Sequence, residues 1–312
     1  MDIRHVTEER EKEFLGKYAF LSCNSKGRPK PSAEDDIRTC FQRDRDKILH
    51  SKEFRRLKHK TQVFSCFEIN DHLRTRLIHS LEVTQVARTI ARALKLNEDL
   101  TEAAAMGHDL GHCAFSHSGE RVLNKIFGGF NHSENSAKIA EKLNLTYEVI
   151  DAIRLHSDID FKEKHMTLES KIVVYSDKFA YLNADMDDGI RMGLISEDDI
   201  PADIRRVLGE TSKQRLNSMI RDIIKTSLDK SDISMSEEVN GKFVRLREFM
   251  FERLYFSPEM TEKDKTIENM LVRIYEFEKK KNKTDEEILD FMAGMSDSYA
   301  RHYYNYIMND CQ

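Results

Sequence analysis

Apolar side chains recur at helical spacing along most of the chain. After Arg74 they stand four or five residues apart, at Leu77, Leu81, Val86, Ile90 and Leu94. Most of these positions fall near one face of a helix, so residues 74–96 are predicted to form a long buried helix. Asn97 is a suitable N-cap for the next helix, because Glu98 and Asp99 then stand in its first turn, where the helix dipole favours acids.

The same spacing predicts helices over most of the remaining chain. A Gly- and Pro-rich loop at residues 22–32 separates two N-terminal helices, and Gly189 and Gly193 are predicted to mark turns. The one strand-like stretch is TQVFSCF, residues 61–67, which suits a short hairpin arm. Further helices are expected near residues 98–107, 117–127, 133–145, 147–156, 168–183, 202–230, 237–256 and 285–308.

The composition favours an all-α fold. The chain has 312 residues but only 12 Gly and 4 Pro, fewer than a fold with many tight turns requires. Charged residues make up 34% and hydrophobic residues 39%, which suits amphipathic helices with solvated outer faces. We therefore predict one all-α domain, in which residues 200–312 form a helical subdomain.

Charge and cysteine content restrict the partners and the compartment. The formal net charge is only -5, so no global basic surface for nucleic acid is indicated. The cysteines are odd in number and form no CxxC pair, which is typical of reduced thiols in a cytosol. No apolar run is long enough to cross a membrane, and the N-terminal segment is too charged for a signal peptide. A cytoplasmic protein with no membrane partner is expected.

Histidines gather in one part of the chain, with five of them at residues 79–132. His108 and Asp109 are adjacent at the end of an Ala-rich segment, where a buried carboxylate requires a positive partner. Because no Lys or Arg stands close to Asp109 in the sequence, a divalent cation is expected. His79, His108, Asp109 and a later carboxylate would form a mixed nitrogen and oxygen set, which suits Mn, Fe, Ni or Zn better than Mg or Ca.

Asp177 is the expected later carboxylate, because it stands in an otherwise apolar segment. Asp177, Tyr181 and Asp185 are spaced i, i+4 and i+8, so they line one face of a helix. The apolar neighbours Val173 and Val174 make this face less exposed than an ordinary surface. Asp177 is therefore predicted to complete the metal site.

These residues carry a resemblance to a known family. His79, His108-Asp109 and Asp177 resemble the H…HD…D signature of HD-domain phosphohydrolases. Six ordered segments between about residues 10 and 300 are similar, more narrowly, to the deoxynucleoside triphosphate triphosphohydrolases, the dGTPase-like family. They are RDRDKILHSKEFRRLKHKTQVF (43–64), DHLRTRLIHSLEV (71–83), EAAAMGHDLGHCAFSHSGE (102–120), GGFNHSENS (128–136), DKFAYLNADMDDGIRMG (177–193) and FMAGMSDSYA (291–300).

The resemblance implies a fold and partners. The fold would be an HD-domain helical bundle with an additional C-terminal helical region. Residues 1–60 would form an N-terminal helical arm and loop, 61–200 the metal and nucleotide site, and 201–312 a subdomain packed on the HD core. The implied partners are a dNTP substrate, further copies of the chain in a homo-oligomer, and an allosteric dNTP.

The resemblance also implies a reaction, the metal-dependent hydrolysis of a dNTP to a deoxynucleoside and inorganic triphosphate. The leaving group is an alkoxide, so a general acid is needed. The family's catalytic pair falls on His117 and Glu120, while His112 and His132 are expected to contact phosphates or water. The implied metal ligands are His79, His108, Asp109 and Asp177.

Substrate contacts follow from the same resemblance. Gln62 matches a glutamine near the sugar 3′ hydroxyl. Arg76 is expected beside the metal, where it can reach phosphate or base, and Lys178 is placed for the phosphates, which Mg can accompany. Tyr181 matches an aromatic residue that packs under the deoxyribose, and Asp185 an acid that accepts from the 3′ hydroxyl.

The sequence departs from many relatives in two places and leaves other functions open. Cys113 and Ala114 follow the GH pair where a Pro-rich pair is common, and Ala184 replaces a frequent histidine. The alternatives are another HD phosphohydrolase, such as a nucleotide phosphodiesterase or 5′-nucleotidase, and a non-catalytic nucleotide-binding regulator. Product analysis separates the three.

Overall fold

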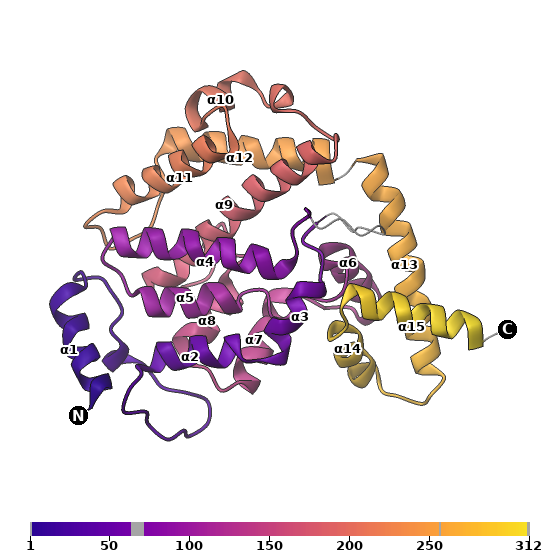
Figure 1. Cartoon of the computed structure of the whole chain (residues 1–312), viewed down its shortest axis with the longest axis horizontal. Helices are drawn as coiled ribbons and strands as arrows, with labels where there is room; N and C mark the ends of the chain where they lie inside the picture. The colour runs from indigo at the N-terminus through magenta and orange to yellow at the C-terminus, as the bar shows by residue number, and fades with distance from the viewer. Residues whose placement is uncertain (1, 64–71, 256, 311–312) are drawn as a thin grey trace.

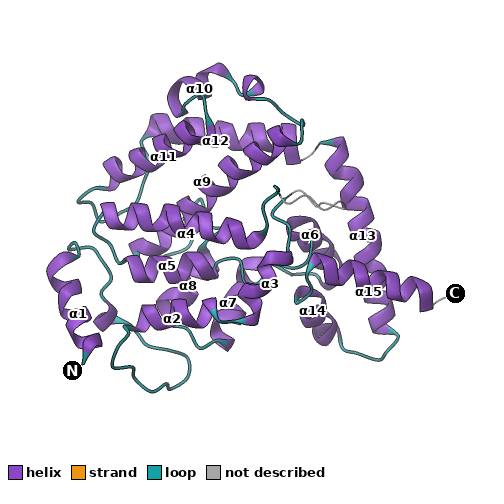
Figure 2. Cartoon of the chain, viewed as in Figure 1, coloured by secondary structure: helices purple, strands orange, loops and turns teal. Residues whose placement is uncertain are grey.

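Helices form almost all of the regular structure. The computed structural model describes residues 2–63, 72–255 and 257–310. Within these residues there are 15 α-helices and no strand, and an isolated antiparallel bridge joins Thr61 to Thr75 (Figure 2). The all-α prediction is confirmed. The predicted hairpin arm at residues 61–67 lies outside the described residues from position 64 onward.

The N-terminal part consists of short helices around the predicted loop. Polar caps define where its helices begin; Thr39, for example, forms a reciprocal capping box with Gln42. The loop at residues 22–32 is present and contains one short 3₁₀ turn. The elements are α1 (Ile3–Phe14), η1 (Ser22–Asn24), α2 (Cys40–Leu49), α3 (Lys52–Arg56) and η2 (Leu57–His59).

Six central helices carry the predicted site. They are α4 (Arg76–Ala93), α5 (Glu98–Gly107), α6 (Ser116–Phe127), α7 (His132–Lys142), α8 (Tyr147–Leu155) and α9 (Leu168–Arg191). The helices α4, α5 and α9 pack against one another, and α8 packs against α5 and α9. Small residues such as Ala87, Ala91, Ala104 and Ala105 are fully buried between them, which lets the backbones approach closely.

The C-terminal helices form two groups beside this centre (Figure 1). Separate apolar clusters join the two groups to it. They are α10 (Ala202–Leu208), α11 (Ser212–Ser227), α12 (Glu237–Met250), the π-helical turn η4 (Phe251–Tyr255), α13 (Pro258–Lys279), α14 (Asp285–Ala293) and α15 (Asp297–Asp310). The helices α11 and α12 pack on α9, whereas α13 and α14 pack on α6. The predicted domain boundaries at residues 60 and 200 stay predictions.

Two predicted helices are divided in the structure. The segment 202–230 breaks at Gly209, whose φ of +124° takes the backbone out of the helical range between α10 and α11. The segment 285–308 breaks between Ala293 and Asp297, where α14 ends and α15 begins. The helix α13 was not predicted. None of the helices in the described residues is apolar and long enough to cross a membrane.

The predicted turn at Gly189 is wrong, because α9 continues through it to Arg191. A side chain at Gly189 would stand 2.9 Å from Cδ1 of Leu254, so the glycine allows η4 to pack closely on α9. This contact brings η4 over the half of α9 that carries the predicted sugar contacts. The helix runs beyond its predicted end at residue 183, whereas the predicted turn at Gly193 is present, with a φ of +71°.

Candidate active site

The four predicted metal ligands come from three packed elements. His79 stands in the first turn of α4, His108 and Asp109 follow the last turn of α5, and Asp177 lies in the middle of α9. All four side chains are buried. Because α4, α5 and α9 pack against one another, residues that are far apart in the sequence meet at one point.

The distances show that the four side chains converge. Nε2 of His79 lies 3.1 Å from Oδ1 of Asp177 and 3.8 Å from Oδ2 of Asp109. Nε2 of His108 lies 3.4 Å from Oδ2 of Asp109 and 3.7 Å from Oδ1 of Asp177. Ligand atoms of His79, His108 and Asp177 all lie within 4.8 Å of one another, a spacing that could hold a metal ion.

The tautomer of His108 fits a metal ligand. Its Nδ1 donates to the backbone oxygen of Ala105 at 2.7 Å, so Nε2 of the neutral ring carries a lone pair. Burial lowers the pKa of His108, which keeps the ring neutral. Among the described residues, Nε2 has no hydrogen-bond partner and faces carboxylate oxygens instead. A divalent transition metal fits this set of imidazole and carboxylate donors.

Two basic residues already neutralise the carboxylates. Arg76 pairs with Oδ2 of Asp109 at 2.8 Å, and Lys178 pairs with Oδ2 of Asp177 at 2.8 Å. Although burial raises the pKa of both carboxyl groups, these cations bring both pKa values well below the usual range. The inference that Asp109 lacks a basic partner was therefore wrong, because Arg76 reaches it from α4. A bound dication would leave the cluster with net positive charge, which suits phosphates.

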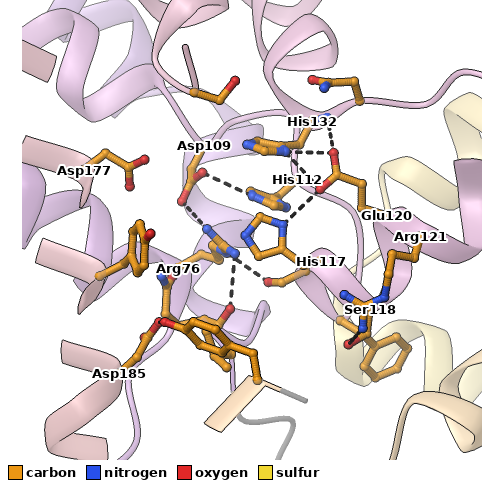
Figure 3. Close-up of a pocket in the computed structure, with 18 of the residues that line it drawn as sticks. Arg76, Asp109, His112, His117, Ser118, Glu120, Arg121, His132, Asp177 and Asp185 are labelled. Carbon is orange, nitrogen blue, oxygen red and sulfur yellow. Dashed lines mark hydrogen bonds and ion pairs between the residues drawn. The ribbon is translucent and has the colours of Figure 1, made fainter. Parts of the chain in front are cut away.

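Glu120 holds two imidazoles (Figure 3). Its carboxylate accepts from Nδ1 of His117 at 3.0 Å and from Nδ1 of His132 at 2.8 Å. Burial alone would raise the pKa of Glu120, but hydrogen bonds from both rings bring it well below its usual range. The expected contact between His117 and Glu120 is present, while their catalytic role stays a prediction. The second contact, to His132, was not predicted.

His112 and His156 complete the group of imidazoles. The ring of His112 stacks on His132 with centroids 4.0 Å apart, and its Nε2 lies 3.4 Å from Oδ1 of Asp109. Nδ1 of His156 donates to the backbone oxygen of Ile153 at 2.7 Å, and its Nε2 lies 3.2 Å from Nε2 of His132. Burial lowers the pKa of both His112 and His156 well below the ordinary value, so both rings are neutral.

A cavity of about 560 Å³ opens beside these side chains. Asp185 lies in its wall and accepts a hydrogen bond from the Tyr255 hydroxyl at 2.7 Å, while burial raises the pKa of Asp185 to about 7. The half-buried ring of Tyr181 lies 5.6 Å from Nζ of Lys178. All the predicted substrate contacts line this cavity, namely Gln62, Arg76, Lys178, Tyr181 and Asp185.

The segment between α5 and α6 is packed tightly against α7. A side chain at Gly111 would stand 2.1 Å from the backbone nitrogen of Ser136, so only glycine fits. The backbone N–H of Gly111 also donates to Oγ of Ser136 at 2.8 Å. Cys113 in this segment is buried, and burial raises the pKa of its thiol to about 12. The thiol is therefore a packing group and not a thiolate.

Curated proteins of similar length match this chain. It is 46% identical to the deoxyguanosinetriphosphate triphosphohydrolase-like protein of Caldanaerobacter subterraneus subsp. tengcongensis, over 96% of this chain and 94% of that protein. It is 43% identical to a protein of the same name from Clostridium perfringens, over 98% of both chains. The chain belongs to the family of deoxyguanosinetriphosphate triphosphohydrolase-like proteins.

Two further likenesses agree with this membership of the dGTPase-like family. The HD domain profile matches residues 76–182, the part of the chain that contains the four predicted ligands. A solved structure of a hypothetical protein from Aquifex aeolicus has a TM-score of 0.51 and 20% identity, covering 83% of this chain and 67% of that one. The second likeness concerns the fold alone. The predicted family and the predicted HD-domain fold are confirmed.

Several cavity residues of this dGTPase-like chain were not predicted. His156 had a readable signal, because it ends an apolar helix and is followed by a polar segment. The others come from the end of α12 and from η4, where the sequence pattern indicated only helix, and from α13, which was not predicted. The cavity-lining residues that were missed include His156, Arg247, Phe251, Tyr255 and Met260.

Proposed function

We propose that this chain is a metal-dependent triphosphohydrolase that converts a dNTP and water into a deoxynucleoside and inorganic triphosphate. The observation that carries the proposal is one cavity that is lined by the two carboxylates of the His/Asp cluster, by the His117–Glu120 pair and by basic side chains. The relatives' names, which refer to dGTP, support the same substrate class.

His79, His108, Asp109 and Asp177 would hold one divalent metal ion. When bound, such an ion lowers the pKa of a coordinated water and polarises a phosphate oxygen. The chain's own contribution is to fix the ligands, because His108 is held by Ala105 and Asp109 by Arg76. Mn, Fe, Ni and Zn all suit the donor set, and a Mg ion would accompany the phosphates.

His117 would act as the general acid. Water adds to the α-phosphorus, the bond from that phosphorus to the 5′ oxygen breaks, and the imidazolium of His117 gives its proton to the leaving oxygen. Glu120 accepts from Nδ1 of His117, so Nε2 is the nitrogen left to face the cavity. Burial lowers the pKa of His117, and the ionised Glu120 carboxylate opposes this shift by favouring the protonated ring. His112 and His132 would contact the phosphates or the water.

The remaining predicted contacts would select and orient the substrate. Arg76 and Lys178 supply positive charge for the triphosphate, which carries about four negative charges. Tyr181 would pack under the deoxyribose, with Gln62 and Asp185 at its 3′ hydroxyl. The hydrogen bond from Tyr255 to Asp185 supports this placement, because it fixes the carboxyl group on the cavity wall.

Product analysis tests the proposal. The purified protein is incubated with each dNTP and NTP in the presence of Mn²⁺ or Mg²⁺, and products are resolved by chromatography. We expect inorganic triphosphate and deoxynucleoside in equal amounts. Monophosphate or single phosphate release would indicate another HD phosphohydrolase, and no turnover with retained dNTP binding would indicate a regulator.

Assembly, regulation and location belong to the same proposal. We expect a homo-oligomer, whose permanent interfaces usually bury more than about 2,000 Å². We also expect activation by a second, allosteric dNTP, and a cytoplasmic location. Sedimentation at micromolar concentration tests the first expectation, and the rate of dNTP hydrolysis with and without a second dNTP tests the second.

A further inference from the structure

A buried lysine lies beside the segment that leads from the predicted metal ligands to His117. Lys60 follows the short turn η2 and is only 2% exposed. Among the described residues, its ammonium group forms no ion pair with a carboxylate and instead donates to backbone oxygens. A charge is expensive to bury, and methionine would fill the space without that cost. The reaction outlined above does not use this ammonium group.

The ammonium group of Lys60 joins two parts of the chain that are far apart in the sequence. Nζ donates to the backbone oxygen of His112 and, at 3.5 Å, to that of Ala293. Ala293 is the last residue of α14, and the last four carbonyl groups of a helix have no partner within it. The helix dipole also favours a cation there. Lys60 therefore connects the end of α14 to the segment that carries His112.

This segment is held on both sides. Lys60 binds the carbonyl oxygen of His112, and Asp297 accepts from the backbone N–H of Phe115 at 2.8 Å. The segment between these two contacts connects the predicted ligands to His117. If the contact with Lys60 is lost, His112 and His117 shift together, while the ligands on α4 and α9 stay in place.

The surroundings of Lys60 leave it charged at neutral pH. Burial lowers its pKa, and so do the cations Arg56 on α3 and Arg76 on α4. Cys113 and Asp297 also face it and oppose this shift, so the pKa is about 8. Below that pH the donor is an ammonium group, whose hydrogen bonds are stronger than those of a neutral amine.

We propose that Lys60 is a positioning residue for the reaction, because its ammonium group fixes the segment that carries His112 and His117. The inference rests on the proposed function, in which His117 is the general acid. Lys60 is not among the residues that line the cavity, so it acts on the substrate only through this segment.

Kinetics of full-length variants test the inference with dGTP and Mn²⁺. In Lys60→Met we expect kcat for triphosphate release to fall by about 10–100-fold, because a displacement of about 1 Å at a catalytic group can cost about 10²-fold. KM and Mn content should stay near the wild-type values, since Arg76, Lys178 and the ligands are untouched. Lys58→Met is the matched control, because Lys58 is a nearby exposed lysine, and it should behave like the wild type.

Lys60→Arg adds a pH-dependent measurement. Arginine keeps its charge above pH 8, where Lys60 loses it. The ratio of kcat in Lys60→Arg to kcat in the wild type should therefore rise as the pH increases through about 8. A wild-type kcat in folded Lys60→Met, or a ratio that does not change with pH, would overturn the inference. Failure of both variants to fold, as judged by circular dichroism, would also overturn it, because Lys60 would then serve the fold alone.

The NMR signals of the histidine rings separate this inference from the proposed function, because they need no turnover. The rings of His112 and His117, assigned through single variants, should shift in Lys60→Met but not in Lys58→Met. The ring of His165, which pairs with Ser170, should shift in neither. Unshifted signals in Lys60→Met would overturn the positioning role even if the wild type releases triphosphate. Shifted signals in a protein that releases no triphosphate from any dNTP would support the positioning role and contradict the proposed function.

Discussion

The carboxylate of Glu120 couples two histidines of unequal exposure. Because it is ionised and accepts from Nδ1 of both rings, it fixes the same tautomer in each. The side chain of His117 is 55% exposed, whereas that of His132 is 11% exposed. A leaving group that enters the cavity therefore reaches His117 more easily. The difference in exposure favours His117 as the proton donor to the leaving group. It favours His132 as a fixed contact deeper in the cavity.

Removing the His117 ring should affect turnover more than binding. In His117→Ala we expect kcat to fall by about 10²–10⁴-fold, the usual contribution of a general acid, while KM and metal content stay near the wild-type values. Steady-state kinetics with a dNTP and elemental analysis measure these quantities. A loss of substrate affinity as large as the loss of kcat would mean that His117 binds phosphate instead.

Tyr181 should select the sugar. A ring packed against the deoxyribose leaves little room for a 2′ hydroxyl, and a buried hydroxyl without a partner costs roughly 1–3 kcal/mol. We expect kcat/KM for dGTP to exceed that for GTP by at least about tenfold. Tyr181→Ala should narrow the difference, and Tyr181→Phe, which keeps the ring, should preserve it. If Tyr181→Ala discriminates as well as the wild type, the sugar lies elsewhere in the cavity.

At the scale of elements, α15 lies outside the helices α4 to α9 that carry most of the site, but it holds the segment that enters α6. Asp297 at its start accepts from the backbone N–H of Phe115 at 2.8 Å and from that of Thr61 at 3.1 Å. Phe115 and Ser116 have φ values of 61° and 51°, a left-handed conformation that non-glycine residues adopt at a cost. Asp297 therefore holds a strained entry into α6, directly before His117.

Replacing Asp297 with Asn should weaken this support without touching the substrate. Both oxygens of Asp297 accept hydrogen bonds, whereas an Asn side chain has one acceptor, so one donor is left unpaired at a cost of about 1–3 kcal/mol. We expect a lower free energy of unfolding and a lower kcat, with metal content unchanged. Denaturant unfolding and kinetics measure the two effects. Wild-type values for both would show that α15 does not position α6.

The start of α9 should make stability depend on pH. Oε1 of Glu169 accepts from the backbone N–H groups of Phe20 and Asn97, both at 3.0 Å, and burial raises the pKa of Glu169 from 4.5 to about 7. The fold thus favours the protonated acid. Its contribution is complete below about pH 4.5 and is lost as the pH rises to about 7.

The variant Glu169→Gln keeps one acceptor oxygen but cannot ionise. Its free energy of unfolding should therefore increase relative to the wild type between about pH 4.5 and 7, and the difference should then level off. Urea unfolding at a series of pH values measures this difference. A difference that does not change with pH would mean that the pKa of Glu169 is the same in the folded and in the unfolded protein.

At the scale of the molecule, long-range contacts set the limit of what the sequence could predict. The spacing of apolar residues predicted most of the central helices. Residue type predicted the four metal ligands, whose side chains do converge, because His and Asp are among the few residues that suit a buried metal site. The contacts of Arg76 with Asp109 and of Tyr255 with Asp185 join residues 33 and 70 positions apart. No local pattern encodes such pairs. The passage of α9 through Gly189 likewise depends on packing by η4, which only the folded chain reveals.

Metal binding should stabilise the whole molecule, because the predicted ligands join α4, α9 and the end of α5. An ion present at a hundred times its Kd adds about 2.7 kcal/mol to the free energy of unfolding. For a chain of this size, that raises Tm by on the order of 5 °C. Calorimetry of chelator-treated protein with and without Mn²⁺ measures the shift. Asp109→Ala should lose most of it, since Asp109 is one of the four predicted ligands. His165→Ala, which removes a buried histidine that pairs with Ser170 instead, should shift like the wild type. An equal shift in Asp109→Ala would show that the stabilising ion binds elsewhere.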